Sequence, residues 1–310
     1  MSKLITVVSG CYNEEANLEE LVSRVWAVAG HFPQYRWEYI LIDNCSTDES
    51  ARILRRLAAA DPRIKVIFNT RNFGHIRSPY HGILQAYGDA VVYLASDLQD
   101  PPELIAQFIP QWEAGFKVVA AIKNQSEESP VFFMARKAYY HLIAQLTELD
   151  LLKNFTGFGL YDRVIQEHMR KLEDPYPYHR GMISELGYPV ARVPFVQPRR
   201  KRGFSNNNFY TLYDIAMLGL TNHTKVPLRL TAMLGFAMAS FSFLAGMTYF
   251  LMKLFYWREF VMGQAPIVVG LFFLGSVQLL FIGIAGEYIG AIHTKVTKRP
   301  LVVERERLNF

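Results

Sequence analysis

The sequence predicts an α/β protein, with a Rossmann-like, mainly parallel sheet domain followed by an amphipathic juxtamembrane helix and a two-helix transmembrane hairpin. Up to about residue 122, short β-branched runs alternate with amphipathic helical patterns. This order is typical of a parallel sheet covered by helices. Nearer the C-terminus, residues 230–252 and 260–286 contain no charged side chain. Each run exceeds the roughly 20 residues that cross a bilayer.

Five apolar runs are predicted to be the strands of the sheet. They are too uniformly apolar for a sheet with one wet face, and they lie at residues 4–10, 38–43, 65–69, 90–96 and 117–122. Asn13 is predicted to cap the helix after the first strand, because acidic residues follow it. Residues 130–148 predict another helix, and residues 208–222 predict an amphipathic helix that suits packing on protein or on a membrane interface.

The patterns divide the 310 residues into four segments. These are a sheet domain at 1–200, a juxtamembrane segment at 201–225, two transmembrane helices at 226–292 and a tail at 293–310. Basic residues flank the spans on both sides, at Lys225, Arg229, Lys295, Lys298 and Arg299. The positive-inside rule therefore predicts a multi-pass protein of the inner (cytoplasmic) membrane, with the sheet domain and the tail in the cytoplasm.

Composition and charge agree with a soluble domain attached to a membrane segment. Apolar residues make up 51% of the chain and charged residues 20%. Two cysteines, Cys11 and Cys45, cannot form a disulfide framework and suit a reducing compartment, as small residues beside strands. The net charge is +5, and the segment 192–202 holds five basic residues without an acid. Such a run before a membrane span suits lipid phosphates or an anionic substrate, and no nucleic-acid partner is expected.

Polar residues follow three of the predicted strands. Tyr12 and Asn13 follow the first strand, Asp43 ends the second, and Asp97 follows the fourth. In open α/β sheets, ligands bind at the carboxyl ends of the strands, so these segments should converge on one crevice. Asp43 is placed to accept a hydrogen bond from the base or sugar of a nucleotide. A role in capping the next helix is an equal alternative for this segment.

Asp97 calls for an explanation because it follows so apolar a strand. The two prolines after Asp100 fit the first turn of a helix, so Asp100 is explained as its N-cap. Oxygen atoms of Asp97 and Gln99 would suit Mg²⁺ or Mn²⁺, with phosphates of the substrate as further ligands. An ordinary strand-to-helix turn is the alternative.

Two further motifs lie at residues 71–75 and 157–159. The motif RNFGH at 71–75 follows the third strand and suits a phosphate or base, whereas His75 by itself indicates a helix start rather than a catalyst. The glycines at 157 and 159 lack the third glycine and the strand–helix order of a dinucleotide fingerprint. A nicotinamide cofactor is therefore not expected.

Taken together, the motifs resemble those of the family 2 glycosyltransferases with the GT-A fold. They are YNEE at 12–15, DNCSTD at 43–48, RNFGH at 71–75 and SDLQDPPE at 96–103, with the hairpin behind them. Over nearly its full length, the chain resembles the polyprenyl-phosphate glycosyltransferases, relatives of dolichol-phosphate mannose synthase. The resemblance implies inverting transfer of one sugar from a nucleotide-diphosphate sugar to a membrane polyprenyl phosphate, for cell-surface glycan assembly. It leaves open whether the protein is a homo-oligomer.

The resemblance also implies roles for individual residues. It assigns nucleotide-sugar binding to Tyr12, Asn13, Glu14, Asp43, Arg71, Asn72, Gly74 and Ser96. It makes Asp97 and Gln99 the second and third members of an Asp-x-Asp-x-Gln motif that holds Mg²⁺ or Mn²⁺. Arg200 matches the arginine of an Arg-x-x-Gly-x-Ser/Thr element that faces phosphates, and Asp97, Arg200 and Arg202 are the implied catalytic residues.

The chain departs from the family pattern at two acidic positions. Ala95 replaces the first aspartate of the metal motif, and Phe158 stands where a Thr-Gly-Asp segment has its acid. The two missing acids matter less if the acceptor is a phosphate, because its second pKa of about 6 leaves it largely dianionic at pH 7. Such an acceptor needs orientation and no general base, so a metal site with fewer protein ligands would suffice.

Two other kinds of protein are alternatives to such a transferase. A catalytically degenerate scaffold that binds a nucleotide-sugar within a glycan-assembly complex is the alternative that the missing acids favour. A processive polysaccharide synthase would carry a Gln-x-x-Arg-Trp motif and more spans, and the sequence has neither.

Overall fold

The computed structural model describes most of the chain. The described residues are 2–125, 152, 154–198, 217, 224–255, 264–297 and 299–310. The predicted helix at 130–148 and the arginine run at 199–202 lie outside them, as does the amphipathic helix at 208–222 apart from residue 217.

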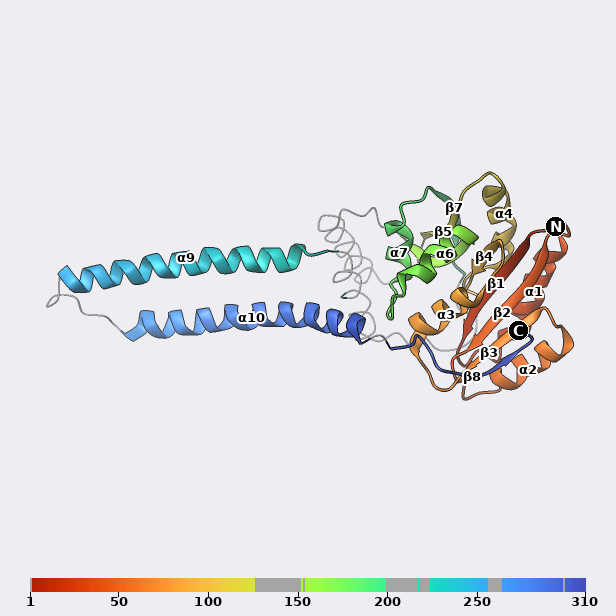
Figure 1. Ribbon diagram of the computed structural model, residues 1–310, viewed down its shortest axis with the longest axis horizontal. Coiled ribbons are helices and arrows are strands. Elements are labelled where there is room, and N and C mark those ends of the chain that lie inside the picture. The colour runs from red at the N-terminus through yellow and green to blue at the C-terminus, as the bar shows by residue number, and fades with distance from the viewer. Residues whose placement is uncertain are drawn as a thin grey trace.

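A central sheet positions the rest of the globular domain (Figure 1). Within the described residues it has eight strands in the order β7-β5-β6-β4-β1-β2-β3-β8. Their bounds are Leu4–Cys11 (β1), Arg36–Asp43 (β2), Ile64–Asn69 (β3), Ala90–Tyr93 (β4), Val118–Gln125 (β5), Phe155–Asp162 (β6), Val190–Val196 (β7) and Glu304–Leu308 (β8). Strands β1 to β4 are parallel, as is the pair β5 and β7, whereas β6 and β8 are antiparallel to their neighbours. The mainly parallel sheet is therefore confirmed.

Helices cover both faces of this sheet and bury the strands between two apolar clusters. One face carries α1 (Leu18–Gly30), α2 (Ser50–Ala60), a 3-10 turn (Pro102–Leu104) and α4 (Ile105–Glu113). The other face carries α3 (Gly74–Gln85), α6 (Arg163–Leu172) and α7 (His179–Glu185). Burial on both faces explains why the five predicted strands are continuous apolar runs.

The start of α1 differs from the expectation. Asn13 is not its cap, because α1 begins at Leu18 and Asn17 occupies the N-cap position. Asn13 instead has a left-handed backbone with φ of 56°, a conformation that asparagine tolerates better than most residues. Its side chain is engaged across the site, as described below.

Three segments that were not predicted as strands, β6, β7 and β8, complete the sheet. The glycine-rich segment forms β6, where a side chain on Gly159 would put its Cβ 2.3 Å from the carbonyl oxygen of Val119. Only glycine allows β5 and β6 to pair there. Residues Glu304–Leu308 of the tail form β8, which pairs with β3, so the chain returns from its C-terminal helices to the same sheet.

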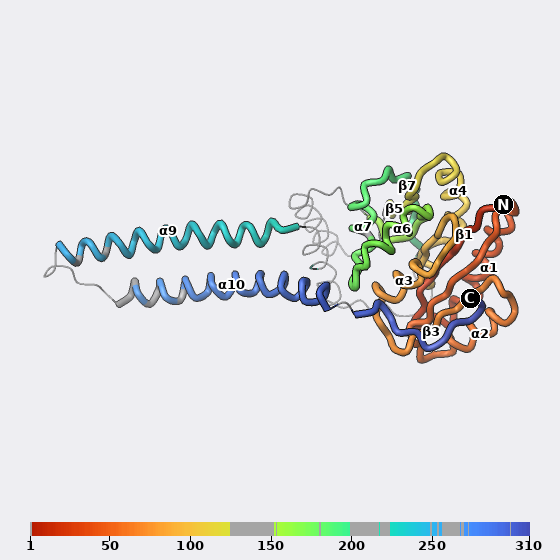
Figure 2. The backbone as a smooth tube through the Cα atoms, in the orientation of Figure 1, coloured from red at the N-terminus to blue at the C-terminus, as the bar shows by residue number. Residues whose placement is uncertain are grey.

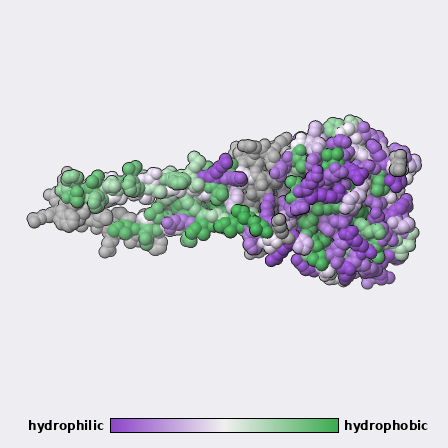
Figure 3. All heavy atoms as spheres, in the orientation of Figure 1, coloured by the Kyte–Doolittle hydropathy of each residue, from purple (hydrophilic) through white to green (hydrophobic). Residues whose placement is uncertain are grey.

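Two long helices project from the globular domain as a hairpin (Figures 1 and 2). They are α9 (Val226–Phe255) and α10 (Gln264–Val296), and the predicted spans fall on them. By length and composition, Val226–Met252 and Phe273–Val296 can each cross a membrane. Only 0% and 6% of their most apolar windows are buried, and Figure 3 shows apolar residues along their surface. Exposed apolar surface of this extent marks a site of interaction with a membrane or another protein.

Candidate functional site

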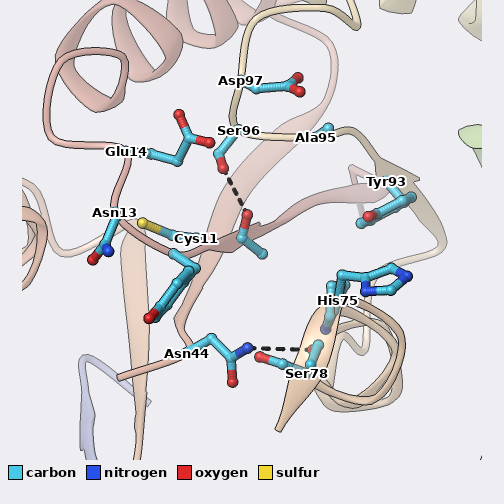
Figure 4. Close-up of a pocket in the computed structure, with 14 residues that line it drawn as sticks. Cys11, Asn13, Glu14, Asn44, His75, Ser78, Tyr93, Ala95, Ser96 and Asp97 are labelled. Atoms are coloured by element: carbon cyan, nitrogen blue, oxygen red, sulfur yellow. Dashed lines mark hydrogen bonds between the residues drawn. The ribbon is translucent and has the colours of Figure 1, made fainter. Parts of the chain in front are cut away.

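A cavity of about 410 Å³ lies at the carboxyl ends of β1, β2 and β4 (Figure 4). Three loops and the start of α3 supply its walls, which is the convergence predicted from the sequence. The lining residues are Gly10, Cys11, Tyr12, Asn13, Glu14, Asn44, Gly74, His75, Ser78, Pro79, Tyr93, Ala95, Ser96 and Asp97.

The loops after β1 and β2 hold each other in place. The Asn13 side chain accepts a hydrogen bond from the backbone N–H of Thr47 at 2.8 Å, and its own backbone N–H donates to Ser46 Oγ at 3.0 Å. The backbone N–H of Glu14 donates to Ser50 Oγ at 2.9 Å. These bonds fix the residues Tyr12–Glu14 against the start of α2, so Asn13 organises the site rather than the helix.

Asn44 connects the loop after β2 to the loop after β3. It is buried, and its Nδ2 donates to Asn72 Oδ1 at 2.8 Å and to the carbonyl of Gly74 at 3.2 Å. Its Oδ1 accepts from the backbone N–H of Phe73 at 2.9 Å and from Asn69 Nδ2 at 3.1 Å. One amide therefore fixes the wall of the cavity formed by residues 72–74.

The wall after β4 presents Asp97 to the cavity. Leu98 has φ of 60°, and the backbone N–H of Gln99 donates to Asp97 Oδ1 at 3.1 Å. Asp100 closes the turn by accepting from the backbone N–H of Ala95 at 3.0 Å. Asp97 is half-buried and lines the cavity, as Figure 4 shows. The structure thus separates the two acids: Asp100 stabilises the turn and Asp97 faces the open space.

Ser96 joins this wall to β1. Its hydroxyl donates to the carbonyl of Gly10 at 2.7 Å (Figure 4). Gly10 also allows α3 to approach, because a Cβ at this position would lie 2.6 Å from Pro79 Cγ. A larger residue at position 10 would push α3 away and open the floor of the cavity.

Asp43 lies beneath the site and does not line the cavity. It is fully buried and accepts from the backbone N–H of Ser46 at 3.2 Å. Burial raises the pKa of Asp43, while the hydrogen bonds from Ser46 and the charge of Arg305 oppose that rise. Burial, followed by the charge of Asp43, also raises the pKa of the Cys11 thiol, so Cys11 is neutral and serves as small apolar filling, as expected.

A second cavity of about 350 Å³ adjoins the first. The two share His75, Pro79, Tyr93, Ala95 and Asp97. The second cavity adds residues from β6 and from the start of α7, among them Thr156, Tyr178 and His179. No sequence pattern indicates this cavity, because its residues come from segments that share no motif. Asp97 stands where the two cavities meet.

The residues predicted for the site fall into three groups. Six of them line the first cavity: Tyr12, Asn13, Glu14, Gly74, Ser96 and Asp97. Asp43, Arg71, Asn72 and Gln99 do not line the first cavity. The Arg71 guanidinium lies 4.0 Å from the Phe73 ring centre. The Gln99 amide nitrogen is 3.4 Å from the carbonyl of Pro198. Arg200 and Arg202 lie outside the described residues.

A divalent ion would find few protein ligands here. Among the described residues, no three His, Cys, Asp or Glu side chains are grouped as a metal site. Asp162, the acid nearest in sequence to the Thr156–Phe158 segment, is held by Trp112 Nε1 at 2.8 Å and Lys117 Nζ at 3.0 Å. Mg²⁺ is often bound by one or two carboxylates together with substrate phosphates. Asp97 at the cavity wall fits that mode.

The sequence is similar to a known family and to proteins of other organisms. The model of the family described as "Glycosyl transferase family 2" matches residues 6–169. The chain is 33% identical to the uncharacterized glycosyltransferase YkcC of Bacillus subtilis, over 96% of this chain and 92% of that protein. It is 32% identical to the bactoprenol glucosyl transferase of Shigella phage SfII, over 96% of both chains.

A solved structure agrees with the fold. The mannosyltransferase PcManGT from Pyrobaculum calidifontis, in complex with GDP-Man and Mn²⁺, superposes with a TM-score of 0.50 at 15% identity. The alignment covers 93% of this chain and 88% of that one. At this identity the likeness concerns the fold alone, and it confirms the predicted GT-A fold.

Proposed function

Because the chain belongs to glycosyl transferase family 2, we propose that it transfers one sugar from a nucleotide-diphosphate sugar to a membrane polyprenyl phosphate, with inversion. The observation that carries this proposal is the full-length similarity to bactoprenol glucosyl transferases, which includes the hairpin as well as the sheet domain. Bactoprenol is a polyprenol, and an acceptor with a long apolar tail suits a catalytic domain that is attached to two apolar helices.

The first cavity is the proposed donor site. Tyr12, Asn13 and Glu14 line it, and Asp43 and the loop at 71–74 support the nucleotide from behind. The loops are fixed by the Asn13 and Asn44 hydrogen bonds before a ligand arrives, so little ordering is needed on binding. A cavity of this kind at the carboxyl edge of a sheet is the usual ligand position in α/β proteins.

The proposed cofactor is Mg²⁺ or Mn²⁺, held by Asp97 and the donor's phosphates, with Gln99 as a further ligand. The ion would supply positive charge to the leaving nucleoside diphosphate. Asp97 is the residue that carries this assignment, because it lies at the junction of both cavities. The Gln99 side chain does not line either cavity in this structure.

The proposed reaction is a single displacement at the anomeric carbon. An oxygen of the acceptor phosphate forms the new bond as the bond to the nucleoside diphosphate breaks, which inverts the configuration. Arg200 and Arg202 are proposed to meet the phosphates, since a guanidinium can contact two phosphate oxygens at once. Pro198, which comes just before the arginine run in the sequence, lies beside Gln99.

The proposed location is the inner membrane, with the catalytic domain in the cytoplasm. The hairpin would cross the bilayer twice, and both of its ends would then lie on one side. The pairing of β8 with β3 supports this, because residues on both sides of the hairpin belong to the same sheet.

The scaffold alternative is not favoured, because relatives that share about a third of their residues over the whole length are named as transferases. The experiment that tests the proposal incubates the purified protein with a panel of nucleotide-sugars and a polyprenyl phosphate. Mass spectrometry of the lipid should find a product heavier by one sugar. Nucleotide binding without any lipid product would favour the scaffold.

A further inference from the structure

Strand β8 forms one edge of the sheet, beside β3. In the register of the sheet, Asp43 lies opposite Phe68, and Phe68 lies opposite Glu306. These three residues therefore lie side by side across β2, β3 and β8, and β8 is the strand that follows the hairpin in the sequence. Since β8 is antiparallel, its first residues lie at the carboxyl edge of the parallel strands, where the ligand cavity is.

A β-bulge lies at this point of β8. The partner of Phe68 is Glu306, whereas the partner of the next residue, Asn69, is Glu304. Arg305 is therefore the extra residue of the bulge. Bulges redirect a side chain out of the regular alternation and are frequent beside active sites. Here the Arg305 guanidinium lies over the Phe68 ring, 5.9 Å from its centre.

The charge of Arg305 lowers the pKa of the Asp43 carboxyl, although burial, the larger effect, raises it. Within the described part of the chain, the Arg305 side chain is exposed and makes no hydrogen bond or ion pair. Its neighbours on the strand differ: Glu306 is paired with Arg55, and Arg307 with Glu304 and Gln85. Arg305 thus keeps its donors available for a ligand.

The backbone on either side of Arg305 is held firmly. The N–H of Thr70 donates to the carbonyl of Val303 at 2.9 Å. At the other end, Asn309 Nδ2 donates to the carbonyls of Ala58 at 2.7 Å and Ile64 at 2.8 Å. The position of the Arg305 side chain is therefore set by the sheet and does not depend on a free tail.

We propose that Arg305 is a binding residue of the donor site and contacts the nucleoside part of the nucleotide-sugar at the Asp43 end. The inference rests on the proposed function, because it takes the first cavity as the donor site. It adds that the site combines residues that precede the hairpin in the sequence, residues 12–14, with a residue that follows it, Arg305.

The test compares two arginines of the same strand. Purified full-length protein in detergent is titrated with nucleoside diphosphates by calorimetry, as wild type, Arg305→Ala, Arg305→Lys and Arg307→Ala, and the melting temperature of each is recorded. Arg305→Ala should weaken binding about tenfold or more, whereas Arg307→Ala, which removes contacts to Glu304, Gln85 and the Phe310 ring, should stay within about twofold. Arg305→Lys should be intermediate, because it keeps the charge without the planar fork.

Equal affinities of Arg305→Ala and Arg307→Ala would overturn the inference, because docking of the strand would then explain any loss. If Arg305→Ala also melts earlier, Arg305→Lys decides: intermediate affinity supports the contact, and wild-type affinity contradicts it. A wild-type protein that binds no nucleoside diphosphate would overturn the proposed function and this inference together. Wild-type transfer with unchanged Arg305→Ala binding would overturn the inference alone.

Discussion

Replacing Asn44 by alanine should destabilise the protein and weaken donor binding. The substitution removes four hydrogen bonds, to Asn69, Asn72, Phe73 and Gly74. Two of these partners keep another bond, because Asn69 still donates to Ser78 and Asn72 still accepts from the N–H of Gly74. We therefore count two bonds as lost in full, which costs about 2–3 kcal/mol of unfolding free energy.

The matched control is Ser78→Ala, which removes one bond of the same cluster, the 2.9 Å contact from Asn69. It should cost about 1 kcal/mol. With about 2–4 °C per kcal/mol for a domain of this size, Asn44→Ala should melt about 4–12 °C below wild type and Ser78→Ala about 2–4 °C below. Melting is followed by tryptophan fluorescence in detergent. If both variants melt alike, or Asn44→Ala melts with wild type, Asn44 does not organise this wall.

Three other predictions concern the reaction and the membrane. Removal of divalent ions by a chelator should abolish transfer, and added Mg²⁺ or Mn²⁺ should restore it; full activity in excess chelator would rule out the ion at Asp97. Arg200→Ala should lower lipid-linked product far more than Arg192→Ala, measured with a short-chain polyprenyl phosphate; equal small losses of about 1 kcal/mol would mean general attraction to anionic lipid. Thr297→Cys should resist a membrane-impermeant thiol reagent added outside sealed cells, and labelling there would contradict the cytoplasmic placement of the tail.

The sequence predicts those parts of the structure in which neighbouring residues share one role in the fold. The five apolar strands are buried on both faces, so their composition alone identified them. The position of the site followed from the polar residues after those strands, because parallel strands bring their carboxyl ends together. Asp97 stood out for the same reason, as a carboxylate after a buried strand.

The rest depends on contacts that are distant in sequence. The alternating charges of Glu304–Leu308 resemble a solvated tail, and they form a strand because the edge of β3 offers unpaired backbone groups. The sequence predicts Asn13 as a helix cap, but Asn13 instead forms hydrogen bonds with Thr47 and Ser46 across the site. Two glycines interrupt β6 and weaken its strand pattern, and Gly159 is required by the close approach of β6 to β5. A pattern of neighbouring residues cannot predict these contacts between distant segments.

The most direct test of the proposed transfer is the amount of one-sugar lipid product formed by wild type and by Asp97→Asn from the same nucleotide-sugar and polyprenyl phosphate. Asparagine keeps the size of the side chain and removes its charge, so the fold and the melting temperature should be unchanged. We expect clear product with wild type and at least about 100-fold less with Asp97→Asn, as for the loss of a major electrostatic contribution to a transition state. Equal product from the two proteins, or none from wild type with any nucleotide-sugar, would contradict the assignment of this cavity as a sugar-transfer site.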